Sequence, residues 1–189
     1  MSLRVFQFFL FATAASLFPT GPLSGALSNG QRYRVNFVDV DGNAISTADG
    51  HITVLAQAAT ADADKARAVG DRVPDYCLAN PIYRMITVLH FSKKGTGIGR
   101  KIATMLVRYR LNEEAKRLQA RYDAKKIASN ARSDIFVVAD FDGTASSQLG
   151  GLPGPTDFHV FVFGRNGELL QQWNEVPSAE DLAAALKQT

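Results

Sequence analysis

Four stretches of the chain are largely apolar, which is typical of strands that are buried on both faces of a sheet. They span residues 52–58, 83–91, 135–141 and 158–163. The turn sequence Arg165-Asn166-Gly167 and a further strand over residues 168–173 follow the fourth stretch. These last two strands are therefore predicted to form a hairpin.

An earlier segment alternates between apolar and polar positions instead. Residues 33–40 alternate, Asp41-Gly42 marks a tight turn, and residues 44–49 return the chain. Alternation with a period of two suits a strand that has one exposed face. The pattern predicts an outer hairpin ahead of the central sheet.

Helical periodicity governs the segments between these strands. A first helix is expected to begin near Thr60 or Asp62, either of which can cap it, and to end around Arg72 because Pro74 follows. A last helix should begin after Ser178 as its cap. Crossover helices force parallel pairing and the hairpin adds an antiparallel edge, so the order of elements predicts a mixed α/β sheet.

The longest helical signal runs over residues 98–128. One helix and two abutting helices both fit, because Asn112 can cap a second half. The basic residues along it are expected to form a solvated face with acidic neighbours. Its apolar side chains form one stripe: Ile98, Ile102, Met105, Leu106 and Tyr109, continued by Ala115, Leu118 and Tyr122.

Composition adds bounds to this picture. A chain of 189 residues with 46% apolar and 21% charged positions suits one domain with a sizeable core. The net charge of +3 is too small to require nucleic acid or an anionic membrane as a partner. The single cysteine, Cys77, excludes an intramolecular disulfide.

The N-terminus is predicted to be a signal peptide that is cleaved after Ala26. Basic Arg4 precedes an apolar run over residues 5–18, and Ser24-Gly25-Ala26 is a small-x-small cleavage site. The run is shorter than the ~20 residues that cross a bilayer, so a membrane anchor and a buried helix are the weaker alternatives. Residues 27–189 would then form one domain in the periplasm or outside the cell.

Three segments resemble the thioredoxin-like superfamily, in particular its redoxin branch of peroxiredoxin-like, alkyl hydroperoxide reductase-like and exported bacterial thioredoxin-like proteins. They are NFVDVDGNAISTADGHITVLAQAAT, IFVVADFDGTASSQLGG and FHVFVFGRNGELLQQW. The resemblance implies a thioredoxin-like fold: a central mixed sheet flanked by helices, here with an N-terminal β-hairpin extension.

The chain departs from that family where its chemistry lies. The family's Cys-X-X-Cys is replaced by Asp62-Ala63-Asp64-Lys65. The position of its substrate-facing proline or arginine falls at Phe158, and Pro153 and Pro155 are interpreted as ordinary loop prolines, with a cis bond left open. Cys77 is expected at the far end of the first helix, where the helix dipole disfavours a thiolate, in a small buried structural role.

Other motifs suggest further chemistry. VVADFDGT, with Asp140 and Asp142, is similar to the aspartate signature of haloacid-dehalogenase-type phosphatases, a remote alternative because little chain follows to supply the other groups that such a site needs. DVDGN lacks the glutamate of a calcium loop. The histidines are far apart in sequence, so no metal and no cofactor is predicted.

The sequence favours an exported, non-catalytic binding or structural module. The enzymatic alternative is a thioredoxin- or peroxiredoxin-like oxidoreductase that uses Cys77 alone. The partner would be an unidentified protein or small molecule, with no nucleic acid and no stable membrane span after cleavage. The oligomeric state is left open.

Overall fold

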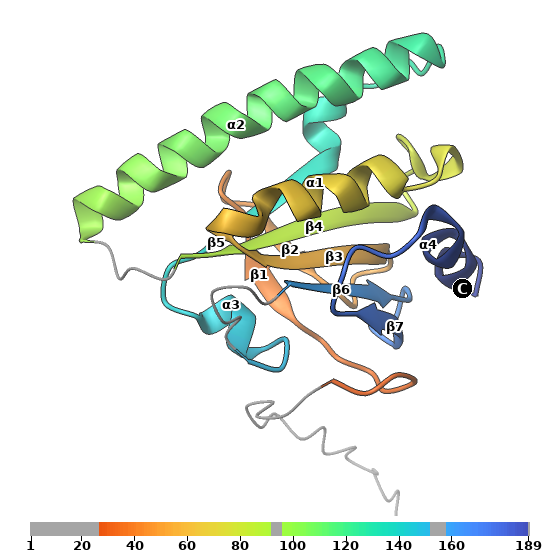
Figure 1. The fold of residues 1–189 in the computed structure, drawn as a ribbon, viewed down its shortest axis with the longest axis horizontal. Coiled ribbons are helices and arrows are strands. Elements are labelled where there is room, and N and C mark those ends of the chain that lie inside the picture. The colour runs from red at the N-terminus through yellow and green to blue at the C-terminus, as the bar shows by residue number, and fades with distance from the viewer. Residues whose placement is uncertain (1–26, 92–95, 152–157, 189) are drawn as a thin grey trace, which may run out of the picture.

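The computed structural model describes residues 27–91, 96–151 and 158–188. Its centre is a five-stranded mixed sheet with the strand order β5-β4-β3-β6-β7 (Figure 1). These strands are β3 (Ile52–Ala59), β4 (Tyr83–His90), β5 (Ile135–Asp140), β6 (Phe158–Phe163) and β7 (Leu169–Trp173). β3 pairs in parallel with β4, and β4 with β5, whereas β6 and β7 pair antiparallel. The predicted mixed α/β sheet is confirmed.

A separate two-stranded hairpin precedes this sheet. Its strands are β1 (Asn36–Val38) and β2 (Ala44–Ser46), paired antiparallel with Phe37 opposite Ile45. Both of these side chains are buried while most of their neighbours in the hairpin are exposed, as the alternation predicted. The N-terminal hairpin extension is therefore confirmed.

Each face of the sheet has its own core. The first face packs against α1 (Ala63–Arg72) and α4 (Ala179–Leu186) through a cluster that includes Val54, Val69 and Leu182. The second face packs against the hairpin and the short helix α3 (Thr144–Ser147). β3 lies between the two cores with all eight residues buried, which is why its sequence is apolar without alternation.

The first helix begins and ends where the sequence predicted, but without the predicted side-chain cap. A single 3-10 turn, η1 (Thr60–Asp62), leads into α1, and α1 stops at Arg72, just ahead of Pro74. Neither Thr60 nor Asp62 makes a side-chain cap hydrogen bond, so the predicted cap is wrong. Asp62 instead pairs with Lys65.

The long helical signal folds as one helix, α2 (Gly97–Ala124), capped by the hydroxyl of Thr96, which accepts a hydrogen bond from Gly99 N at 3.3 Å. Its buried side chains are Val107, Leu111, Ala115 and Tyr122. The first part of the apolar stripe is exposed: Ile98, Ile102, Met105, Leu106 and Tyr109. The single stripe predicted for the whole helix is therefore wrong: the buried side chains follow one another at spacings of four, four and seven and form one face, and the exposed residues lie on the opposite side of the helix.

The C-terminal hairpin and helix form as predicted. Gly167 closes the turn between β6 and β7 with a φ of +81°, and a Cβ at this position would collide with the carbonyl oxygen of Tyr33. Only glycine suits both the backbone conformation and this close approach. α4 is capped by the Ser178 hydroxyl, which accepts a hydrogen bond from Asp181 N at 3.0 Å.

Candidate functional site

The position of the missing cysteine motif lies at the start of α1, directly after the carboxyl end of β3 (Figure 1). Asp62 and Lys65 form an ion pair there, with 2.9 Å between Oδ1 and Nζ. The ammonium group of Lys65 lies 5.9 Å from the ring centroid of Phe158, the residue predicted from the sequence to occupy the family's substrate-facing position. The structure thus brings these three predicted positions together, and none of them carries a sulfur. Pro153 and Pro155 lie outside the described residues.

Cys77 lies away from that position. It ends the 3-10 turn η2 (Asp75–Cys77), beyond the C-terminal end of α1, and its residue is 7% exposed. Its thiol packs in the same core cluster as Ala66 and Val69 of α1. Burial raises the pKa of this thiol from 9.0 to about 12, since a buried site disfavours the charged thiolate. The side chain is therefore a neutral thiol at physiological pH.

The aspartate motif forms a closed hydrogen-bonded turn. Asp140, which is buried, accepts hydrogen bonds from Ala145 N at 3.2 Å and from Ser146 N at 3.1 Å and Ser146 Oγ at 2.5 Å. His90 Nδ1 lies 3.4 Å from the same carboxylate. Hydrogen bonds from Thr144 hold the pKa of Asp142 below its usual value. Both oxygens of the Asp140 carboxylate accept hydrogen bonds within the protein. The carboxylate therefore holds α3 in place and is not accessible to a phosphate group.

Replacement of Asp140 by Asn is expected to reduce the free energy of unfolding by about 1–3 kcal/mol. The Asn side chain has an NH₂ group in place of one carboxylate oxygen, and NH₂ cannot accept the hydrogen bonds that this oxygen now accepts. At least one buried N–H or O–H donor would therefore lose its partner. Urea denaturation measures this loss. Asp142→Asn, at an exposed position of the same turn, is the matched control and should cost less than about 1 kcal/mol.

The same two variants test the phosphatase alternative. Hydrolysis of an aryl phosphate with Mg²⁺ should equal the rate without protein for the wild type and both variants. Magnesium-dependent turnover that Asp140→Asn abolishes would contradict the structural role of this carboxylate.

The remaining sequence candidates for a metal site stay apart. Asp39 closes its own turn, accepting hydrogen bonds from Asp41 N at 2.9 Å and Asn43 N at 2.8 Å. Each histidine has a different partner: His51 pairs with Asp49, His90 with Asp140, and His159 with Asn174. Among the described residues, no cluster of three His, Cys, Asp or Glu side chains could hold a metal ion.

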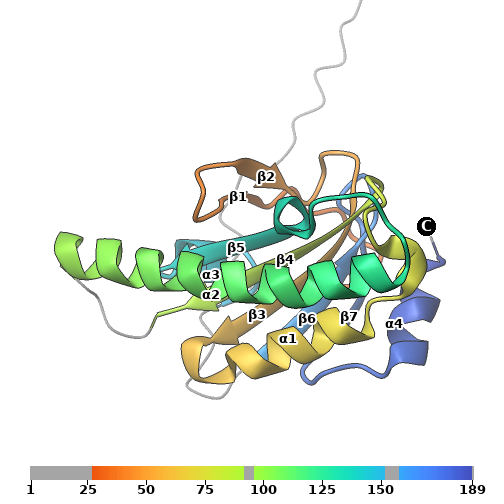
Figure 2. The ribbon, with the colours of Figure 1, turned by 90° about the horizontal axis from the view of Figure 1, so that it is seen from above.

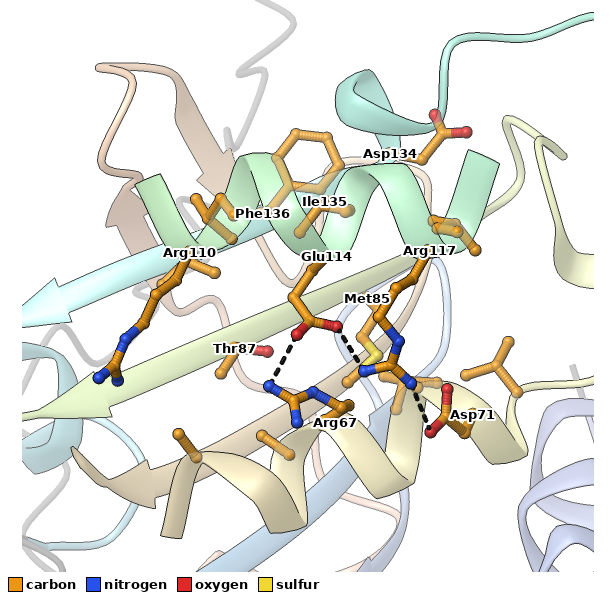
Figure 3. Close-up of a pocket in the computed structure, with 18 of the residues that line it drawn as sticks. Arg67, Asp71, Met85, Thr87, Arg110, Glu114, Arg117, Asp134, Ile135 and Phe136 are labelled. Carbon is orange, nitrogen blue, oxygen red and sulfur yellow. Dashed lines mark hydrogen bonds and ion pairs between the residues drawn. The ribbon is translucent and has the colours of Figure 1, made fainter. Parts of the chain in front are cut away.

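A cavity of about 1060 Å³ lies between α1, α2 and the sheet (Figure 3). Met85 and Thr87 of β4 and Ile135 of β5 line it from the sheet, and Leu111 and Leu118 line it from α2. The volume of the cavity is in the range of small-molecule sites.

Beside the cavity, α2 packs on the β5 edge through Val107 and Leu111, which contact Val40 and Val137. Nearer its C-terminal end the buried Tyr122 holds α2 through hydrogen bonds with Ala79 N and Asp134.

A chain of charged side chains joins α1 to α2 across the cavity (Figure 3). Glu114 of α2 pairs with Arg67 of α1 at 2.7 Å and with Arg117 at 3.2 Å, and Arg117 lies 3.8 Å from Asp71. These pairs confirm that much of the basic content of α2 is balanced by acidic neighbours. Arg110 also lines the cavity, and it makes no hydrogen bond or ion pair with the described chain.

Sequence reasoning missed this cavity. The sequence shows each charged residue of the cavity as part of a polar helix face. Whether these residues form ion pairs between α1 and α2 depends on how far α2 lies from the sheet. No periodicity along one helix reports that separation. The only available signal was the number of charges in α2 that face the neighbouring helix.

No protein-family model matches the sequence, and no characterised protein matches it in a sequence search. Solved structures do match its fold. A thioredoxin-family thiol:disulfide interchange protein from Chlorobium tepidum superimposes with a TM-score of 0.53 at 13% identity, covering 86% of this chain and 98% of the other. The exposed lipoprotein thioredoxin of Streptococcus pneumoniae gives 0.51 at 15% identity, covering 82% and 99%.

These matches, together with the mixed sheet and its flanking helices, show that the chain has a thioredoxin-like fold. The predicted fold class is confirmed. Both structures are aligned over almost their whole length. At such low identity the likeness concerns the fold and not the activity.

Proposed function

We propose that the protein is a thioredoxin-fold binding module that performs no thiol chemistry. One observation carries this proposal. The start of α1 holds the Asp62–Lys65 ion pair, while the only thiol, Cys77, is buried beyond the other end of that helix. A thiolate needs a cation or a helix N-terminus beside it, and a dithiol cycle needs a second sulfur.

The cavity between α1, α2 and the sheet is the proposed binding site. Its apolar lining suits an apolar ligand. Most of its charged groups form ion pairs, Asp134 accepts a hydrogen bond from the Tyr122 hydroxyl, and the Arg110 side chain makes no hydrogen bond or ion pair with the described chain. An unpaired guanidinium favours a negative group on the ligand, since it offers several hydrogen-bond donors to one anion. The ligand class is therefore an apolar organic anion.

Binding of anilinonaphthalene sulfonate, an apolar anion, tests this proposal. Ala103 lines the cavity from α2, so Ala103→Trp should fill part of it and weaken binding at least about tenfold. Ala120→Trp, at an exposed position of the same helix, is the control and should bind as the wild type does. Arg110→Gln should weaken binding by a smaller factor.

Two results would contradict the cavity as the binding site. One is equal binding by the Ala103→Trp and Ala120→Trp proteins. The other is loss of binding on changing Ile102 and Met105, because those exposed residues of α2 lie outside the cavity lining. Circular dichroism of each variant checks that the fold is kept.

We also propose that the protein is exported. The supporting observations are Arg4, the apolar run over residues 5–18 and the small residues that end at Ala26. Among the described residues, no helix is both long and apolar enough to cross a bilayer. N-terminal sequencing of protein from its native host should begin near Leu27, and full-length protein recovered from the cytosol would contradict export.

A further inference from the structure

The first half of α2 carries an exposed apolar stripe. Its members are Ile98, Ile102, Met105, Leu106 and Tyr109, each between 51% and 74% exposed. At ~3.6 residues per turn, all five fall within an arc of about 100° on the helix surface. Val107 and Leu111, which pack against the sheet edge, lie about half a turn away. This part of α2 is apolar on two opposite sides, and only one of them is covered.

The stripe lies on the outermost element of the molecule. α2 forms the layer farthest from the sheet, and its first turns run past the end of the sheet in two perpendicular views (Figure 1 and Figure 2). The stripe is thus exposed on a helix that projects from the rest of the molecule. An apolar stripe on a projecting helix can rest on a flat surface without any change in the fold.

Basic side chains accompany the stripe and acidic ones are absent. Between Gly97 and Leu111 there is no Asp or Glu; Glu113 is the first acidic residue of α2. Arg108 pairs with Asp41, and Arg100 lies over the ring of Phe141. Basic Lys101 borders the stripe on one side, and Arg110 borders it on the other, where the stripe meets the cavity at Leu106. Neither of these two basic side chains makes a hydrogen bond or ion pair with the described chain.

We propose that this stripe docks on the surface of an anionic lipid bilayer, with the axis of α2 parallel to the membrane plane. Exposed apolar side chains bordered by Lys and Arg, with Tyr among them, match the composition of interfacial helices. Long basic side chains keep their charge at the headgroups while their stems cover apolar surface. The net charge of +3 does not indicate this site, because the acidic residues that balance the basic ones lie in other parts of the chain.

A second copy of the chain fits the stripe less well. If the stripes of two copies packed face to face, Lys101 and Arg110 of one copy would lie near the same basic residues of the other. Residues 97–111 contain no acidic group that could offset this repulsion. Anionic headgroups supply the opposite charge on both sides of the stripe.

Vesicle co-sedimentation tests the proposal. Protein that begins at Leu27, the first described residue, excludes the apolar N-terminal run as an anchor. It should bind vesicles containing about 30% phosphatidylglycerol, bind more weakly as salt rises, and not bind phosphatidylcholine alone. Lys101→Gln with Arg110→Gln should reduce binding about 25-fold, at about fivefold for each basic residue. Ile102→Gln with Met105→Gln should reduce it at least about tenfold.

Lys116→Gln is the control, because this residue lies in the second half of α2 and pairs with Glu113. It should bind as the wild type does. Absence of binding to the anionic vesicles, or binding that both double variants retain, would overturn the proposal. So would a dimer in sedimentation equilibrium that Ile102→Gln with Met105→Gln dissociates, since it would assign the stripe to a second copy of the chain.

Discussion

Replacement of Arg84 by Met is expected to lower the free energy of unfolding by about 2–3 kcal/mol, less than the loss of a fully buried ion pair because the Asp49 side chain is 31% exposed. Arg84 points from β4 into the loop before β3 and is 8% exposed. It donates to both oxygens of Asp49, at 2.9 and 3.0 Å, and to the carbonyl oxygen of Ser46 at 2.6 Å. Met fills similar space but offers no donor, so these acceptors lose their partner.

Urea denaturation of the Arg84→Met protein measures this loss. Arg34→Met is the matched control, since Arg34 is exposed and its change should stay within about 0.5 kcal/mol of the wild type. Equal stability of the two variants would show that the hydrogen bonds of Arg84 contribute nothing to the folded state.

The same ion pair predicts a loss of stability in acid. Burial alone raises the pKa of Asp49, but hydrogen bonds from Arg84, His51 and Ser46 outweigh burial and hold the pKa well below its ordinary value of 3.8. A depressed pKa in the folded state contributes stability above the unfolded value and loses it as pH falls. The wild type should therefore lose stability below about pH 4, and Arg84→Met should flatten this dependence.

Cys77 is expected to react with an aromatic disulfide reagent about a thousandfold more slowly than a free thiol at pH 8. Burial raises the pKa of its thiol from 9.0 to about 12, which reduces the thiolate fraction by about that factor. In guanidinium chloride the unfolded chain should react as a free thiol does. A native-state rate within about tenfold of the free thiol would place Cys77 in contact with solvent.

Much of the fold could be predicted from local patterns. β3 is apolar throughout because both of its faces are covered, and the turn at Gly167 needs a residue without a side chain. Each of these two patterns is contained within a few neighbouring residues, and the packing of the folded protein agrees with both. The order of strands and helices then leaves few ways to assemble the sheet.

The features that escaped prediction depend on distances between elements. The periodicity of α2 gave one stripe, but the helix packs on the sheet edge through Val107 and Leu111 and leaves Ile98 and Met105 exposed. Nothing in the apolar strand around Arg84 indicated its acceptors, which are Ser46 at the end of β2 and Asp49 in the turn that follows. The cavity beside Glu114 is lined by residues of α1, α2 and the sheet, which are far apart in the sequence.

Turnover of disulfide and peroxide substrates tests the absence of thiol chemistry most directly. Insulin reduction and peroxide consumption, each with dithiothreitol as donor, should equal the rate without protein, and Cys77→Ser should change neither. This follows because one buried neutral thiol can neither cycle through an internal disulfide nor attack a peroxide efficiently. A rate well above the control that disappears in the Cys77→Ser protein would contradict the binding-module proposal and identify a one-cysteine oxidoreductase.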